Sequence, residues 1–334
     1  MIKIFSYSQA GLDLGEKLKD FLKADHYNKR ITAFNVKTIL KENWQTAEAF
    51  IFISSTGIAV RMIKDFIKTK DQDPAIIVID DTGKNVISLL SGHLGGANDL
   101  TRTLAEFLGA NPVITTSTDN HGIEAVDSFA RTNDYRLADK NKILPISKLM
   151  LEGKTIGFYS EADKVIDYNH IKVLENLDDL SGLDGLIVVS NKIERDLPIP
   201  SIYLHPKNLN LGIGCRRDTP GEKIISFIKD QLNDLGLSFY SIKKIGSVEA
   251  KRDEVGIQEA TDYFKVEKKI FSNDQIKTVE DKFDKSDFVK KTIGVYSVAE
   301  PCAYLLGGRL LTKRLKKDGI TLAISLEDKW KNYM

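Results

Sequence analysis

Cysteine is scarce in this sequence, and neither sign of charge is in surplus. Cys215 and Cys302 are the two cysteines of 334 residues, and they form no Cys-x-x-Cys pair. A disulfide scaffold and a cysteine-rich zinc site are therefore not expected. The 48 Lys and Arg residues nearly balance 47 Asp and Glu residues, which gives a formal net charge of +1. Proteins that bind nucleic-acid backbones usually concentrate positive charge, so we expect no nucleic acid as partner.

Long apolar runs are lacking as well. None approaches the roughly 20 residues that cross a bilayer, and the first residues have no apolar core of signal-peptide length. We therefore expect a cytoplasmic protein with no membrane partner. What is present is an ordinary globular balance of 42% hydrophobic and 28% charged residues. At roughly 150 residues per domain, the chain should hold two to three domains.

The first 130 residues alternate short apolar or β-branched runs with amphipathic segments. This alternation predicts an α/β domain with a mainly parallel, helix-covered sheet. Turn-forming residues at 81–85 indicate a hairpin that leads into the run 86–90. The expected strands are 2–6, 32–36, 49–54, 75–80, 86–90 and 112–116.

Two further parts follow. Residues 131–153 are polar and without period, and we interpret them as a connector to a small α/β segment with strands at 155–159 and 186–190. In the last part, Thr219 is expected to cap a helix, with Pro220 at its first position and Glu222 completing a capping box. A strand at 208–213 should precede it, and helices at 248–263, 272–280 and 298–306 and a strand at 320–325 should follow. The predicted domains are an amino-terminal domain 1–130, a small middle domain 131–207 and a carboxyl-terminal domain 208–334.

A glycine-rich turn with one histidine follows the expected strand 86–90. Glycines let a ligand approach the backbone, and the start of a helix, here expected at Asn98, offers N–H groups to an anion. His93 can exchange a proton near neutral pH. The alternative is a tight turn in which the histidine merely packs. The Gly-x-x-Gly-Gly spacing fits neither the dinucleotide fingerprint nor a phosphate loop. The residues concerned are Gly92, His93, Gly95, Gly96, Ala97 and Asn98.

A run of hydroxyl side chains that includes Thr115 and Thr116 leads to Asp119 directly after the expected strand 112–116. The ends of parallel strands are where such sheets bind ligands. The alternative is that one of these residues simply caps the next helix.

The last part of the chain holds a third set of polar candidates. Gly214 exposes backbone, and the forked side chains of Arg216 and Arg217 suit carboxylates, although adjacent arginines on a loop are often just solvated. Cys215 has no histidine nearby in sequence that would make it a nucleophile. Lys251 and Glu254 fit a surface ion pair on one helix face. Glu300 fits a capping box that begins at Ser297.

Together these stretches resemble the CbiG family of cobalamin biosynthesis. Residues 55–61 are similar to the family's Gly-Ile-x-Val-Arg element, which here ends at Arg61, and 73–75 and 88–98 match its central signature. Residues 112–119 are similar to its Thr-Thr-x-Thr-Asp motif. The resemblance covers nearly the whole chain except 131–205, and His121 departs from it, because an apolar or small residue is expected there. The segments 212–217, 251–254 and 297–301 resemble the CobE-like domain that ends the family's chains.

The resemblance implies a cobalt-precorrin-5A hydrolase of the anaerobic corrin pathway. Its substrate is a cobalt-bearing, ring-contracted tetrapyrrole with a δ-lactone that joins the ring-A acetate to the extruded carbon. The enzyme opens the lactone with water and releases the two-carbon unit as acetaldehyde, which gives cobalt-precorrin-5B. No cofactor and no protein-held metal are expected, because the cobalt belongs to the substrate. Neighbouring enzymes of the pathway are a second class of expected partner.

The chemistry assigns roles to the candidates. Lactone opening needs a base for water and a donor for the developing oxyanion, and loss of the two-carbon unit needs a proton for the macrocycle. His93 is the first acid/base candidate, Asp119 the second and Glu300 the third. Backbone N–H groups near Gly95, Gly96 and Ala97 should receive oxyanion or carboxylate oxygens. Substrate carboxylates should pair with Arg61, Arg216, Arg217 and Lys251.

A second class of function fits the same residues. The glycines and arginines would equally serve a non-catalytic protein that carries a cobalt-corrinoid intermediate to a partner enzyme. A sugar- or nucleotide-binding protein is disfavoured, because no phosphate-loop motif occurs in the sequence.

Overall fold

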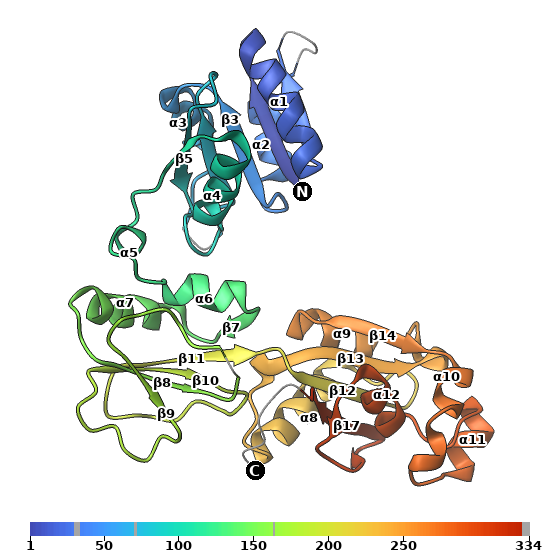
Figure 1. The fold of residues 1–334 in the computed structure, drawn as a ribbon. Coiled ribbons are helices and arrows are strands. Elements are labelled where there is room, and N and C mark those ends of the chain that lie inside the picture. Colours follow the sequence, from blue (N-terminus) through green and yellow to red (C-terminus); the bar gives the residue numbers. More distant parts are fainter. Residues whose placement is uncertain (30–33, 70–71, 163, 329–334) are drawn as a thin grey trace. The chain divides into compact units, whose positions relative to one another are not determined.

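The computed structural model describes residues 1–29, 34–69, 72–162 and 164–328. The chain divides into two compact units, Met1–Arg131 and Thr132–Met334. The first unit contains one sheet and the second contains two, and helices accompany each sheet (Figure 1).

The sheet of the amino-terminal unit has the strand order β2-β1-β3-β4-β5-β6. Strands β1 to β4 run parallel, β5 runs antiparallel to β4, and β6 is parallel to β5. The strands are β1 (Ile2–Ser6), β2 (Asp25–Asn28), β3 (Ala49–Ile53), β4 (Ala75–Ile79), β5 (Asn85–Leu90) and β6 (Asn111–Val113). The helices are α1 (Gln9–Leu22), α2 (Val36–Asn43), α3 (Thr56–Ile63), α4 (Ala97–Leu108), α5 (Ser117–Asn120) and α6 (Val126–Thr132).

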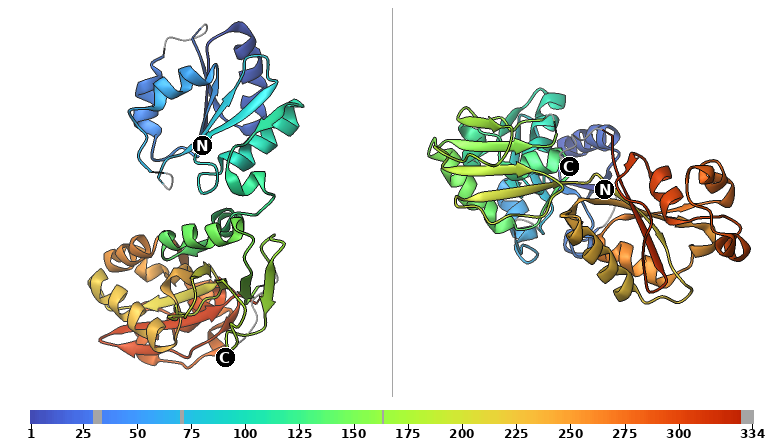
Figure 2. Two further views of the ribbon diagram at one scale, coloured as in Figure 1. Left: turned by 90° about the vertical axis from the view of Figure 1, so that its left-hand side faces the viewer. Right: turned by 90° about the horizontal axis from the view of Figure 1, so that it is seen from below.

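Helices cover both faces of this sheet (Figures 1 and 2). On one face, Leu18 of α1 and Leu104 of α4 pack with Ile51 of β3 in one core. On the other face, Leu40 of α2 and Ile63 of α3 pack against the neighbouring side chains of the same strands. Side chains alternate along a strand, so a strand buried on both faces must be apolar at every position, as β3 and β4 are. The predicted mainly parallel, helix-covered sheet is confirmed.

The hairpin between β4 and β5 is also confirmed, and it decides where the site lies. Because it reverses the chain, β5 and β6 end at the sheet edge opposite to the ends of β1, β3 and β4. The glycine-rich turn after β5 and the hydroxyl-rich segment after β6 therefore leave the sheet side by side.

The carboxyl-terminal unit begins with a sheet of order β7-β11-β10-β8-β9, in which only β7 is antiparallel to its neighbour among the described strands. Between β7 and β8 lie η1 (Lys140–Lys142) and α7 (Ile143–Leu151). The strands are β7 (Tyr135–Leu137), β8 (Ile156–Ser160), β9 (Ile171–Leu174), β10 (Gly185–Val189) and β11 (Ser201–Pro206).

The last sheet has the order β14-β13-β12-β17-β15, and β16 pairs with β17. Strands β12, β13 and β14 are parallel, and β17 runs antiparallel to β12. The strands are β12 (Leu209–Gly214), β13 (Ile242–Val248), β14 (Glu267–Phe271), β15 (Arg309–Leu310), β16 (Leu315–Lys317) and β17 (Ile320–Leu326). The helices are α8 (Gly221–Asp234), η2 (Phe239–Ser241), η3 (Glu249–Lys251), α9 (Val255–Phe264), α10 (Asn273–Lys277), η4 (Glu280–Lys282), α11 (Asp287–Ile293) and α12 (Ala299–Leu306).

Two segments of the sequence prediction are wrong. The strand expected at 32–36 lies partly outside the described residues, and its remainder leads into α2, where the Asn35 side chain accepts hydrogen bonds from the N–H groups of Lys37 and Thr38. The segment 131–153 is not an aperiodic connector, because it contains β7 and α7. The side chains of Ile143, Ile146 and Met150 on α7 are buried.

The expected helix starts are confirmed in one case and wrong in others. Ser272 and Gln275 form a reciprocal capping box at α10. At α8 the cap residue is Pro220, and the hydroxyl of Thr219 instead donates to the carbonyl of Arg216. The helix expected from 248 begins at Val255. The strand expected at 112–116 ends at Val113.

Candidate functional site

His93 and Asp119 meet at the edge of the amino-terminal sheet. His93 lies in the turn after β5, and Asp119 lies in α5, which follows β6. The Nε2 atom of His93 is 3.0 Å from Oδ2 of Asp119. Their side chains are 16% and 17% exposed, so both are largely desolvated but still open to a ligand. The parallel pairing of β5 and β6 brings together the two stretches that the sequence singled out.

A second carboxylate faces the other ring nitrogen of His93. Oδ1 of Asp127 lies 3.4 Å from Nδ1, and the Asp127 side chain is 10% exposed. Ionised carboxylate oxygens only accept hydrogen bonds, so either ring nitrogen has an acceptor at hand when it carries a proton. The sequence analysis missed Asp127. The available signal was an acid among Val126, Phe129 and Ala130 on the buried face of α6.

Asp119 is held by several donors. Its Oδ2 accepts from Thr116 Oγ1 at 2.6 Å and from Asn98 Nδ2 at 2.9 Å, and its Oδ1 accepts from Arg102. Burial raises the pKa of Asp119, but the hydrogen bonds from Thr116 and Arg102 and the nearby positive charge outweigh it, so the pKa lies below its usual value. Asp119 is therefore ionised near neutral pH.

The glycine-rich turn is closed by its own backbone. The N–H of Gly96 donates to the carbonyl of His93, and those of Ala97 and Asn98 donate to the carbonyls of Ser91 and Gly92. The N–H groups of Gly96 and Ala97 are therefore already used, contrary to their expected role toward a substrate oxygen. The helix cap is Gly96 with φ of 80°, not Asn98.

Asn98 has a different role from the expected cap. Its buried side chain accepts from Ser88 Oγ at 2.7 Å and donates to Thr116 and Asp119. It therefore ties β5 to the segment after β6. A Cβ on Gly92 would lie 2.8 Å from Oδ1 of Asn98, so this glycine leaves the space that the amide needs.

Two arginines that the sequence analysis missed flank the site. Arg102 contacts Asp99 and Asp119, and its side chain is 49% exposed. Arg131 donates from Nε to the carbonyl of His93 at 3.0 Å and also pairs with Asp99. The pair Asp99 and Arg102 has the i,i+3 helix spacing that could have marked this face of α4.

Three other residues of this unit take no part in these contacts. Arg61 is exposed on α3 and donates to the carbonyl of Gly57 at 3.3 Å. Thr115 is exposed. His121, the residue that departs from the family pattern, donates from Nδ1 to the carbonyl of Ser117 at 2.8 Å.

The carboxyl-terminal candidates gather after the parallel strands β12 and β13. Gly214 ends β12, and Arg216 and Arg217 follow it, exposed. Lys251 and Glu254 follow β13 and form a 2.9 Å ion pair with side chains 12% and 7% exposed. This pair is buried, so the expected surface ion pair on a helix is wrong. A hydrogen bond links the two loops, because the backbone N–H of Asp218 donates to Oε1 of Glu254 at 2.6 Å.

Cys215 lies beside this pair, and burial raises the pKa of its thiol. A thiol with a raised pKa is a poor nucleophile at neutral pH. The structure therefore agrees with the sequence analysis in giving Cys215 no nucleophilic role.

Glu300 lies in the first turn of α12 and is 5% exposed. The expected capping box is wrong, because the residue at the cap position is Val298 and no side chain caps the helix. Oε1 of Glu300 accepts from the N–H of Arg314 at 3.2 Å. In the described part of the chain, Oε2 of Glu300 has no hydrogen-bond partner.

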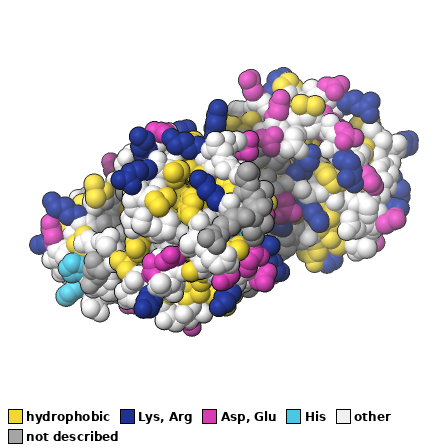
Figure 3. Space-filling view, turned by 90° about the horizontal axis from the view of Figure 1, so that it is seen from above, with side chains coloured by type: hydrophobic (Ala, Val, Ile, Leu, Met, Phe, Trp, Pro, Cys, Tyr) yellow, Lys and Arg dark blue, Asp and Glu magenta, His cyan; other side chains and the backbone are white. Residues whose placement is uncertain are grey.

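Charges of both signs are interspersed over the face in Figure 3. Within the described residues, no helix is long and apolar enough to cross a membrane. Searched over those same ranges, His, Cys, Asp and Glu side chains form no group of three suited to a metal ion.

These features define an α/β protein with a histidine–carboxylate site at the end of two parallel strands. Family models describe the same chain in three successive parts: "Cobalamin synthesis G N-terminal" matches residues 38–119, "Cobalamin biosynthesis central region" matches 124–206, and "Cobalamin synthesis G C-terminus" matches 209–325. The chain belongs to this cobalamin synthesis G family.

Relatives with curated names agree with this assignment. The chain is 37% identical over 294 residues to the cobalt-precorrin-5A hydrolase of Salmonella typhimurium, covering 86% of this chain and 84% of that protein. It is 32% identical over 324 residues to the enzyme of the same name from Priestia megaterium, covering 92% and 86%. The chain also resembles Protein CobE of Sinorhizobium sp, with 26% identity over 121 residues, 35% of this chain and 79% of that protein.

A solved structure is similar along nearly the whole chain. It is described as a putative cobalamin biosynthesis protein G homolog from Sulfolobus solfataricus. The identity is 26%, the match covers 98% of this chain and 97% of that one, and the TM-score is 0.43.

Proposed function

We propose that this chain is a cobalt-precorrin-5A hydrolase of cobalamin biosynthesis that opens the substrate's δ-lactone with water and releases acetaldehyde. Its membership of the family and its similarity to named hydrolases over most of its length support the activity. The observation that carries the site is the imidazole of His93 between the carboxylates of Asp119 and Asp127.

His93 serves as the proton-transfer group. A general base must take a proton from the attacking water, and the same group must later return a proton when the two-carbon unit leaves. An imidazole does both near neutral pH, and the 16% exposure of His93 leaves it within reach of a ligand. His121 is the nearest other histidine in sequence, but its Nδ1 is bound to the backbone of its own helix.

The two aspartates act through His93. Asp119 is held as an anion by Thr116 and Arg102, and it stabilises the protonated ring from the Nε2 side. Asp127 orients the ring from the Nδ1 side. Asp119 is thus a partner of His93 and not a proton donor, because its pKa lies below its usual value.

Positive side chains meet the negative charge of the substrate. Since the N–H groups of Gly96 and Ala97 are bonded within the turn, we assign the oxyanion to the half-exposed guanidinium of Arg102, because its five N–H donors exceed those used by Asp99 and Asp119. Arg61, Arg216 and Arg217 are exposed and suit acetate and propionate groups. Lys251 contributes less, because Glu254 neutralises it. Glu300 stays a third acid/base candidate.

The cobalt is part of the substrate in this proposal. A pathway intermediate must also be received and passed on, so we further propose neighbouring enzymes of the pathway as partners, in the cytoplasm. The macrocycle carries several carboxylates, which the scattered arginines suit better than one strongly basic surface.

The decisive experiment incubates purified full-length protein with a molar excess of cobalt-precorrin-5A and measures acetaldehyde over time. A hydrolase releases many equivalents of acetaldehyde per protein molecule and converts the absorption spectrum of the whole pool. A carrier changes the absorption spectrum of only one equivalent of corrinoid per protein molecule and releases no acetaldehyde. That result would refute the proposed activity.

A further inference from the structure

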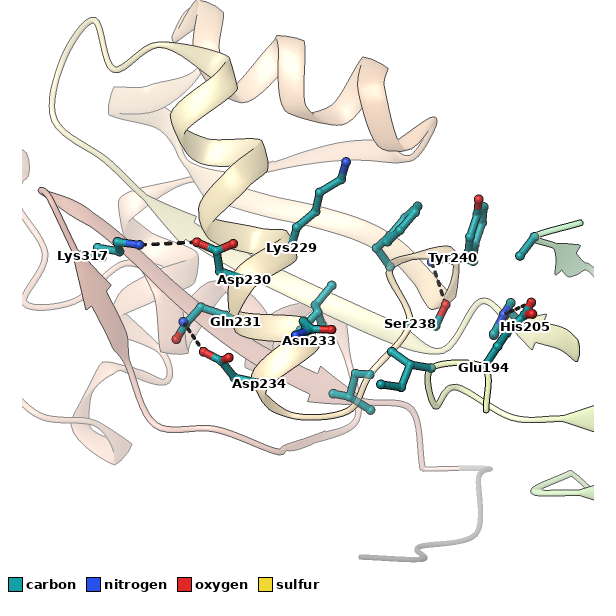
Figure 4. A pocket seen from close by; sticks show the side chains of 15 residues that line it. Glu194, His205, Lys229, Asp230, Gln231, Asn233, Asp234, Ser238, Tyr240 and Lys317 are labelled. Carbon is teal, nitrogen blue, oxygen red and sulfur yellow. Dashed lines mark hydrogen bonds and ion pairs between the residues drawn. The ribbon is translucent and has the colours of Figure 1, made fainter. Parts of the chain in front are cut away.

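A cavity in the carboxyl-terminal unit lies outside every residue assigned above. Its volume is about 690 Å³, and we call it the α8 cavity, because residues at the carboxyl end of α8 line one side. The rest of the lining comes from η2 and the segment that leads into it, the loop after β10, Ala138, His205 and Lys317 (Figure 4). In this view His205 and Glu194 lie at one end of the cavity, and Asp230, Asp234 and Lys317 lie toward the other.

His205 presents a buried nitrogen to this cavity. Its side chain is 1% exposed, and its ring is stacked between those of Tyr203 and Tyr240, with centroid distances of 6.1 and 5.6 Å. Nδ1 lies 3.0 Å from the carbonyl oxygen of Ser190, and a carbonyl only accepts, so Nδ1 carries a proton. In the neutral ring, Nε2 is therefore an acceptor.

This acceptor has no hydrogen-bond partner among the described residues. The nearest polar group is Oε1 of Glu194 at 3.6 Å, a dashed line in Figure 4 that is too long for a hydrogen bond. An acceptor nitrogen and a carboxylate oxygen thus face the same space. A donor with several hydrogens, such as an ammonium group, would satisfy both.

The opposite end of the cavity also favours a cation. Asp234 is the last residue of α8, where the helix dipole disfavours negative charge, and α8 has no basic residue in its last turn. Gln231 donates to Asp234 at 3.4 Å. Throughout the described ranges, no lysine, arginine or histidine forms an ion pair with Asp234, whereas Asp230 one turn earlier pairs with Lys317 at 3.4 Å.

In the described part of the chain, the nearby lysines leave Oε1 of Glu194 and the carboxylate of Asp234 without a lysine partner, since Lys142 pairs with Oε2 of Glu194 and Lys317 pairs with Asp230. Lys229 donates to the hydroxyl of Tyr263 and lies 4.6 Å from the centroid of that ring. In Figure 4 its side chain points away from Glu194 and Asp234. Lys142 binds Glu194 at 2.6 Å through Oε2, which leaves Oε1 toward His205.

We propose that the α8 cavity binds a linear diamine or polyamine. One ammonium group donates to both Nε2 of His205 and Oε1 of Glu194, and a second pairs with Asp234. Leu237 and Phe239 also line the cavity and give the methylene chain of the ligand apolar surface. The site does not depend on the proposed hydrolase activity.

The test is calorimetric titration of the full-length chain with spermidine, with putrescine and butylamine for comparison. We expect saturable binding of one spermidine, and at least about tenfold weaker binding of butylamine, which has a single ammonium group. Asp234→Lys should weaken spermidine binding by at least the same factor while raising Tm, because a cation suits a helix end. The matched control is Asp20→Lys in the last turn of α1, which should leave binding unchanged.

A nitrogen-15 NMR titration of the histidine rings tests the end of the cavity at His205 and Glu194. We expect Nε2 of His205 to be unprotonated in the free protein and to shift when spermidine is added. Two protonated nitrogens in the free protein would overturn the proposal, because His205 and Glu194 would then already form an ion pair. Equal loss of affinity in Asp20→Lys and Asp234→Lys would also overturn it.

Discussion

Nε2 of His93 lies 3.0 Å from Oδ2 of Asp119, and both residues sit just beyond the ends of adjacent parallel strands. Twenty-five residues of chain separate them, including all of α4. The contact exists because β5 and β6 are parallel neighbours, so both strands end at the same edge of the sheet.

Asp127 is expected to position His93. In an Asp127→Asn variant the ring loses a negative neighbour at 3.4 Å, so turnover should fall by about 10- to 100-fold. Separate measurement of kcat and KM for acetaldehyde release checks this, and the loss should fall on kcat. An unchanged kcat with reduced thermal stability would mean that Asp127 is merely structural.

The turn after β5 should tolerate no side chain at Gly95. A Cβ there would lie 2.4 Å from Cβ of Ser91 and 2.7 Å from its carbonyl oxygen. Gly95→Ala should therefore lower the free energy of unfolding by about 1–3 kcal/mol and reduce turnover as the turn shifts. Gly57→Ala is the control, since its Cβ would meet only the Arg61 side chain at 3.4 Å. Equal denaturation midpoints for the two variants would contradict the prediction.

Asp80 should make the stability of the protein depend on acidity. Partial burial raises the pKa of Asp80, but hydrogen bonds from Thr82, Asn85 and Lys84 lower it more, from 3.8 to about 2. Because the pKa of Asp80 is lower in the folded protein than in the unfolded chain, its ionised carboxylate stabilises the fold. This stabilisation is complete at pH values above the pKa in the unfolded chain, and it is lost as the pH falls through about 2.

Asp80→Asn should therefore destabilise the protein by about 1 kcal/mol near pH 7, after allowance for solvent screening, and by much less at pH 2. Urea unfolding at both values measures the difference. If the variant and the unaltered protein differed in free energy of unfolding by the same amount at pH 7 and pH 2, this role for the carboxylate would be ruled out.

The exposed arginines after β12 are expected to bind substrate carboxylates. A double variant, Arg216→Ala with Arg217→Ala, should raise the Kd for the cobalt-corrinoid by about tenfold or more, since charge-assisted pairs contribute strongly. Replacing Lys277 and Arg252, which lie on exposed surface with acidic neighbours, provides the control of equal charge change. Equal affinities for the two double variants would remove the arginines from the binding site.

Much of the fold followed from apolar patterning, and what the pattern missed has physical reasons. Strands β3 and β4 are buried on both faces and read as unbroken apolar runs. Strand β2 is an edge strand with the polar sequence Asp-His-Tyr-Asn, so periodicity does not reveal it. The segment 131–153 looked aperiodic because its short elements are flanked by charged residues.

Some residues of the candidate site could likewise be predicted from the sequence, and others could not. Position after a strand and residue type were enough to single out His93 and Asp119. Asp127 and Arg102 come from helices whose sequences also fit ordinary solvated or packed faces, and only the folded chain brings them to the ring. Lys251 and Glu254 were recognised as a pair, but their burial depends on the loop between β12 and α8.

The most direct test of the central claim compares His93→Ala with His121→Ala in multiple-turnover acetaldehyde release from cobalt-precorrin-5A. The account predicts that His93→Ala loses about 100-fold or more in turnover while still binding the corrinoid, and that His121→Ala stays within about twofold of the unaltered protein. Full turnover by a folded His93→Ala variant would contradict it.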